Sequence, residues 1–164
     1  MGWYRRRPWR DRRVHSLVRR YIKTAVAFLM TGLAIGGWMI ARRELGSRVP
    51  GQYEVSAHTH ALFVGFVMMM ILGVALWLFP RPDKADTRYR PALAEAAYWL
   101  LTLGTGVRVA GELLRASVSD PWLRWLVVIS AFAQIAGLAV FFFTMWSRIR
   151  GLGSQAREAK GERF

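Results

Sequence analysis

Residues 57–82, AHTHALFVGFVMMMILGVALWLFPRP, determine how the rest of the chain can fold. The nineteen residues 61–79 carry no charged or polar side chain. A helix rises about 1.5 Å per residue, so this run is long enough to cross a bilayer core of about 30 Å. We therefore expect a transmembrane helix over residues 57–79, with His58 and His60 in its first turn and Pro80 at its end.

Three further apolar runs have the length of a membrane span. The four expected helices cover residues 21–41, 57–79, 92–114 and 122–146, and most charged residues lie between them. This segregation explains how 54% hydrophobic residues coexist with a formal net charge of +14. The predicted fold class is an all-α integral membrane protein with a four-transmembrane-helix bundle. The membrane domain covers residues 21–148, between a basic arm at 1–20 and a mobile tail at 149–164.

The distribution of basic residues predicts the orientation of the chain. Nine Lys and Arg precede or begin the first helix, four lie in the second loop and five in the tail, against three in the first loop and two in the third. Cytoplasmic segments carry the excess of basic residues, so we expect the N and C termini in the cytoplasm of a bacterial-type inner membrane. The expected partner of this multi-pass protein is the lipid bilayer. The arginines flank apolar runs and form no basic readout face, so we expect no nucleic-acid partner.

The chain contains no cysteine, which excludes disulfides, thiolate metal sites and a covalently attached c-type haem. The basic start and first apolar run resemble a secretory signal, but the run is about twenty residues long and lacks a cleavage site, so we expect it to be retained. The sequence shows no phosphate loop, nucleophile triad or acid–base pair. Hydrolase and kinase functions therefore have no support.

Several polar and small residues fall inside the expected helices. Arg108 and Glu112 are spaced i, i+4 on one face, and charges within a span should face the bundle interior. They form either a mutual ion pair or part of a functional site. Gln134 is expected to make a hydrogen bond between helices. Gly32 and Gly36 predict a close helix contact, either within the chain or between chains of a homo-oligomer.

Two of the three histidines, His58 and His60, begin the second helix. Residues two apart on a helix point about 200° apart, so one of the two is expected to face the interior of the bundle. A neutral imidazole binds haem iron, copper or zinc. One hypothesis is an outer-facing copper or zinc site made by His58, His60 and Glu54. The alternative is that both histidines bond only to lipid headgroups or loop carbonyls.

Several short motifs resemble a known family. His58-Thr59-His60, Gly65-Phe66-Val67, Gly73-Val74-Ala75 and Pro80-Arg81 resemble the second transmembrane helix of subunit I of the haem-copper oxidases. The similarity is closest to the branch of cbb3-type cytochrome c oxidase and nitric oxide reductase, and to short four-helix relatives. The stretch 107–112, VRVAGE, resembles the next helix. The resemblance implies that His58, at the outer end of its helix, is an axial ligand of haem b.

A bound haem would need further contacts from this chain. Met39 is the candidate sixth ligand because it is expected at the depth of His58. The alternatives are a second His58 from a symmetry-related chain, or an open position that binds a gas. Arg108 would pair with a haem propionate, or remain in its ion pair. His60 is the alternative metal ligand.

The family's other axial histidine and its copper-binding histidines lie on later helices, and no histidine follows residue 60 in this chain. We therefore expect no complete oxidase or reductase centre and assign no catalytic residue. The predicted function is haem binding in respiratory electron transfer, or in binding O2 or NO. The alternatives are a cofactor-free accessory or assembly subunit that binds respiratory complex subunits, and the outer-facing copper site.

Overall fold

The structure is a computed structural model that describes residues 8–46, 48–79, 90–149 and 161. Apart from short connections, these residues form α1 (Pro8–Gly46), α2 (Gln52–Thr59), the π-helix η1 (His60–Met68), α3 (Met69–Leu78), α4 (Pro91–Arg115), α5 (Pro121–Met145) and the 3₁₀ turn η2 (Trp146–Arg148). Because α2, η1 and α3 follow one another without a break, the described residues form four helical rods. The predicted all-α class is confirmed for this part of the chain.

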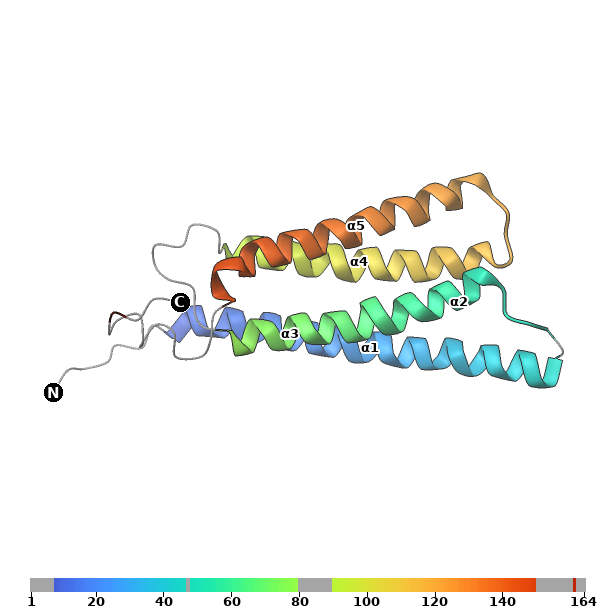
Figure 1. Ribbon diagram of the computed structural model, residues 1–164, viewed down its shortest axis with the longest axis horizontal. Helices are drawn as coiled ribbons and strands as arrows, with labels where there is room; N and C mark the ends of the chain where they lie inside the picture. Colours follow the sequence, from blue (N-terminus) through green and yellow to red (C-terminus); the bar gives the residue numbers. More distant parts are fainter. Residues whose placement is uncertain (1–7, 47, 80–89, 150–160, 162–164) are drawn as a thin grey trace.

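The rods run up and down in sequence order and form two pairs (Figure 1). α1 packs along α2, η1 and α3, while α4 packs along α5. α2 and η1 also contact α4, which joins the two pairs. The start of α1 and the end of α5 lie at one end of the bundle. The connections at residues 48–51 and 116–120 lie at the other, which we call the loop end, and α2 begins there.

Three helical stretches are long and apolar enough to cross a membrane: Ser16–Gly46, Gln52–Leu78 and Pro121–Arg148. α4 and α5 are both 25 residues long, but α4 is not among these three stretches. Its charged residues Arg108 and Glu112 lower its hydropathy. Length and composition thus support three of the four predicted spans.

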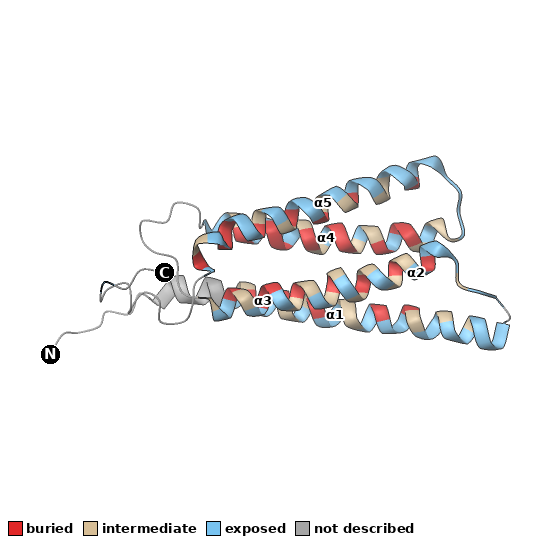
Figure 2. Cartoon of the chain, in the orientation of Figure 1, coloured by how far each residue is buried: buried red, intermediate tan, exposed pale blue. Residues whose placement is uncertain are grey.

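Burial differs between the rods (Figure 2). α4 carries many of the buried residues, whereas α1 and α5 expose much of their surface. The exposed residues include large apolar side chains such as Leu33, Trp77 and Phe132. An apolar outer surface of this kind suits a lipid environment, in which the hydrocarbon tails take the place of water.

The observed helix boundaries correct some predictions. α1 starts at Pro8 and ends at Gly46, so residues 8–20 of the predicted basic arm are helical and continue the first span. No glycine or proline interrupts residues 9–31, and helix formation therefore extends beyond the apolar run. α4 and α5 begin and end within one residue of prediction, each with a proline in its first turn. The tail beyond residue 149 and the Pro80-Arg81 end lie essentially outside the described residues.

The second rod is not the uninterrupted α-helix that the sequence predicted. It begins at Gln52, where Glu54 Oε2 accepts a hydrogen bond of 2.6 Å from the Gly51 backbone N–H. Residues 60–68 then form a π-helix, whose i→i+5 bonds place more residues in each turn than an α-helix does. Within it, a Cβ atom at Gly65 would lie 2.5 Å from Phe28 of α1, so only glycine allows this approach.

The opposite end of the bundle is held by a buried arginine. Arg148, which is 5% exposed at the end of η2, donates hydrogen bonds to the backbone oxygens of Leu76 (3.2 Å) and Phe79 (3.1 Å). Leu76 lies in the last turn of α3 and Phe79 is its C-cap residue, where carbonyls lack the partners that a continuing helix would supply. Arg148 therefore connects the end of the fourth rod to the end of the second.

We predict that Gly137→Ala destabilises the bundle. A Cβ at Gly137 would lie 2.9 Å from Leu101 Cγ and 3.2 Å from the Leu101 backbone nitrogen, so the α4–α5 contact would have to open. Overpacking of this kind costs about 1–3 kcal/mol. Gly37→Ala is the matched control, because no atom lies within 4 Å of its Cβ position. Thermal unfolding in one detergent compares the two variants, and equal unfolding temperatures would contradict the packing described here.

Candidate functional site

The two histidines of the second rod contact different helices. His58 lies on α2 and faces α1, whereas His60 begins η1 and faces α4. This divergence agrees with the angle expected between residues two apart on a helix. The structure therefore separates the two candidate metal ligands into two polar sites near the loop end.

The ring of His58 is oriented by the backbone of α1. Its Nδ1 lies 2.9 Å from the carbonyl oxygen of Gly32. A carbonyl oxygen can only accept a hydrogen bond, so Nδ1 carries the hydrogen and donates it. In a neutral imidazole the other nitrogen, Nε2, then holds the free lone pair. Metal-binding histidines commonly have this arrangement, because the second N–H fixes the tautomer and the ring orientation.

Gly36 provides the space in which this ring lies. A Cβ atom at Gly36 would be 2.7 Å from His58 Cε1 and 3.2 Å from its Nδ1. A Cβ at Gly32 would collide with Leu62. The close contact predicted for the two glycines therefore exists, and it lies within the chain.

His58 lines a small pocket between the end of α1 and the start of the second rod. The pocket has a volume of about 160 Å³ and is lined by Gly36, Met39, Ile40, Arg43, Pro50 and His58. Met39, the candidate sixth ligand, thus lies beside the same pocket as His58; its role as a ligand remains a prediction. The pocket also contains Arg43, which the sequence analysis did not single out.

The residues of this pocket have the chemistry to bind a haem, but the pocket is smaller than a usual cofactor site. An imidazole with a free Nε2 and a thioether are both axial ligands of haem iron. Cofactor sites, however, usually enclose roughly 300–1,000 Å³, which is more than this pocket offers. A haem held by His58 would therefore need more space than this pocket encloses.

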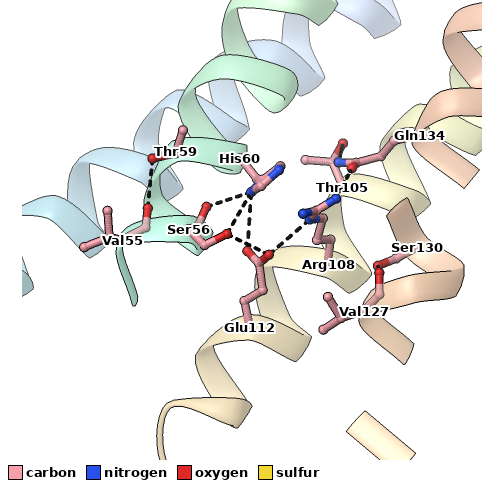
Figure 3. A network of polar contacts seen from close by, with 10 residues as sticks. All are labelled: Val55, Ser56, Thr59, His60, Thr105, Arg108, Glu112, Val127, Ser130 and Gln134. Carbon is pink, nitrogen blue, oxygen red and sulfur yellow. Dashed lines mark hydrogen bonds and ion pairs between the residues drawn. The ribbon is translucent and has the colours of Figure 1, made fainter. Parts of the chain in front are cut away.

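His60 belongs to a polar network on the other side of the second rod (Figure 3). Its Nδ1 donates to the Ser56 backbone oxygen at 2.8 Å and lies 3.5 Å from Glu112 Oε2. The Ser56 hydroxyl donates to Glu112 Oε1 at 2.8 Å. Glu112 is buried, with 3% of its side chain exposed, so α2 and η1 contact a carboxylate inside the bundle.

Arg108 and Gln134 extend this network to α5. Arg108 Nε donates to Glu112 Oε1 at 3.1 Å, and its Nη1 donates to Gln134 Oε1 at 3.3 Å. Gln134 Nε2 donates in turn to Thr105 Oγ1 at 3.0 Å. The predicted helix-to-helix hydrogen bond of Gln134 is confirmed, and Arg108 forms the ion pair with Glu112. The alternative role of Arg108, at a haem propionate, remains a prediction.

The structure does not bring the three residues of the copper or zinc hypothesis together as one cluster. Glu54 accepts hydrogen bonds from the Gly51 backbone and from Arg42 Nη1, the latter at 3.3 Å. His58 and His60 face different helices. In the described ranges, no group of three His, Cys, Asp or Glu side chains lies close enough to hold a metal ion. The angle between the two histidines along the rod accounts for this separation.

Sequence reasoning missed two contributors to these sites. Ser56 lies just before the helix predicted over residues 57–79, yet it is one helical turn before His60 and shares its face, a spacing that could have indicated the contact. Arg43 lies four residues after Met39 on α1, and that spacing could have placed both beside one pocket.

Comparison with known proteins extends the match beyond the second rod. The sequence model of the family described as cytochrome C and quinol oxidase polypeptide I matches residues 10–113. This is more than half of the chain and includes both histidines of the second rod and the Arg108–Glu112 pair. No solved structure matches the chain. The closer relation to cbb3-type oxidases and nitric oxide reductases remains a prediction.

Proposed function

The chain belongs to the cytochrome C and quinol oxidase polypeptide I family, and on this premise we propose that it binds a b-type haem through His58. The proposed role is respiratory electron transfer, or the binding of O2 or NO. The observation that carries this proposal is the 2.9 Å contact between His58 Nδ1 and the Gly32 carbonyl, which leaves Nε2 as the basic nitrogen.

Each residue beside the pocket has a distinct part in this proposal. His58 binds through Nε2, Gly32 orients the ring, and Gly36 lets it approach α1. Met39 is the candidate second ligand, and Arg43, whose Nε donates to Glu44 Oε1 at 2.7 Å, lies beside the same pocket. A bound haem would supply one-electron transfer, or a gas-binding position at its iron.

The small pocket favours an assembly in which a second chain completes the site. A homo-oligomer would supply a second wall and, as an alternative to Met39, a second His58. The proposal is limited to haem binding and does not extend to reduction of O2 or NO.

A second candidate function is favoured by the same volume. A pocket of about 160 Å³ is smaller than usual cofactor sites, which is compatible with a cofactor-free accessory or assembly subunit of a respiratory complex. In that case the close fit of His58 against Gly36 would serve only to hold α1 and α2 together.

We further propose that α4 crosses the membrane, which gives four spans with both termini in the cytoplasm of a bacterial-type inner membrane. α4 has the length of α5 and packs along it. Arg108 and Glu112 are paired with each other, which reduces the cost of placing them in lipid. The excess of basic residues outside the two loop-end connections supports the orientation.

The four-span topology predicts the labelling of single cysteines, for which this chain has no background because it lacks cysteine. Cysteine at Val49 or Ser119, which lie in the two loop-end connections, should react with a membrane-impermeant thiol reagent added outside intact spheroplasts. Cysteine at Arg90 should react only after the membrane is opened. If α4 does not cross, Val49→Cys and Ser119→Cys will label from opposite sides.

The haem proposal predicts a Soret band in the detergent-purified protein. His58→Ala should abolish the band and the extractable haem, whereas His60→Gln should lower the haem content without abolishing the band. Gly36→Ala, which displaces the His58 ring, should weaken haem binding about 10- to 100-fold, the usual effect of disturbing the support of a ligand. A band that survives in His58→Ala would exclude His58 as the ligand. A colourless protein from haem-replete cells would leave the accessory-subunit function.

A further inference from the structure

The first turns of the second rod are held from two sides. On one side His58 donates to the backbone of α1. On the other side Ser56 and His60 contact Glu112 of α4, at 2.8 and 3.5 Å. We propose that Glu112 is a positioning residue for His58: by holding Ser56 and His60, it sets the rotation of α2 that directs the His58 ring at Gly32.

Helix geometry links the directions of the side chains that contact α1 and α4. Each residue of a helix turns the side chain by about 100°, so the directions of Ser56, His58 and His60 are linked through the backbone. A contact that fixes Ser56 and His60 toward α4 therefore fixes His58 on the far side, toward α1. Near the free end of a rod, such side-chain contacts decide the rotation, because the first turn lacks part of its backbone hydrogen bonds.

Glu112 is itself held in place from α5. Its Oε1 accepts from Arg108 Nε, and Arg108 also donates to Gln134. Gln134 is 5% exposed and donates to Thr105. The position of the carboxylate is thus defined by two helices, α4 and α5, that do not line the His58 pocket. The Ser56 hydroxyl hydrogen bond transmits that position to α2.

The two carboxylate oxygens of Glu112 differ in their hydrogen bonds. Oε1 accepts from both Ser56 and Arg108, whereas Oε2 accepts no hydrogen bond from the described residues and faces His60. A buried carboxylate is costly unless it is paired, and replacing such a pair by apolar residues is often neutral for stability. Holding α2 in its rotation is a role that the Glu112 carboxylate can fill and that a packed apolar side chain could not.

The inference rests on the proposed function for its purpose, since haem is what His58 would bind, but the orientation itself can be measured without haem. The experiment uses the full chain with ¹⁵N-labelled histidine, purified in detergent from haem-deficient cells. NMR then reports whether His58 Nδ1 carries the hydrogen and how fast that hydrogen exchanges with water. Glu112→Ala should lose the slowly exchanging His58 Nδ1–H, and the ring should average between tautomers.

Two variants separate positioning from general stability. Glu112→Gln keeps an oxygen that can accept from Ser56 and Arg108, so it should restore the His58 signal. Glu95→Ala removes another ion-paired glutamate of α4, 2.9 Å from Arg20 and half exposed, and should leave the signal unchanged. A His58 signal that persists in a folded Glu112→Ala protein would overturn the proposal. If that variant does not fold, Ser56→Ala tests the same connection, and an unchanged His58 signal there would overturn it equally.

The same variants distinguish failure of this inference from failure of the proposed function. With haem supplied, Glu112→Ala should lower the haem content and change the optical spectrum, while Glu95→Ala should change neither. If the wild-type protein binds no haem yet loses its His58 signal in Glu112→Ala, the positioning role holds and the haem function fails. If haem binding and the His58 signal are both unaffected by Glu112→Ala, the positioning role fails alone.

Discussion

The hydrogen bond from His58 Nδ1 to the Gly32 carbonyl is the contact on which the loop end of the bundle depends. Helices in lipid gain little by excluding water, so packing and hydrogen bonds decide how they are rotated. Gly36 is part of the same contact, because any larger side chain would push the imidazole away from α1. Rotation of α2 would also move Ser56 and His60 away from Glu112. The contacts of the second rod with α1 and with α4 therefore depend on each other.

Buried polar groups connect all four rods. Arg108 and Glu112 lower the hydropathy of α4, yet their contacts with Gln134 and Ser56 are what join α4 to its neighbours. At the other end, Arg148 satisfies the last carbonyls of α3. Unpaired polar groups are expensive in lipid, so each of these charges can be accommodated only in the assembled bundle. Specific polar contacts thereby compensate for the weak apolar drive between helices.

Much of this fold could be predicted from the sequence, for identifiable reasons. The prolines at the starts of α4 and α5 and the long apolar runs fixed those helices within one residue. The π-helix could not be predicted, because its apolar residues have the composition of an ordinary span. The copper hypothesis grouped His58, His60 and Glu54 because they lie close together in the sequence. The structure separates these residues because His58 contacts α1 and His60 contacts α4.

Family membership and the orientation of one imidazole together support haem binding by this chain. The central claim is that His58 Nε2 coordinates haem iron. Pulsed electron paramagnetic resonance of the ferric protein, prepared with ¹⁵N-histidine, tests this claim directly because it detects nitrogen nuclei bonded to the iron. The account predicts a coordinated imidazole nitrogen that is absent in His58→Ala and present in His60→Gln. A spectrum without imidazole coupling, or one unchanged by His58→Ala, would contradict it.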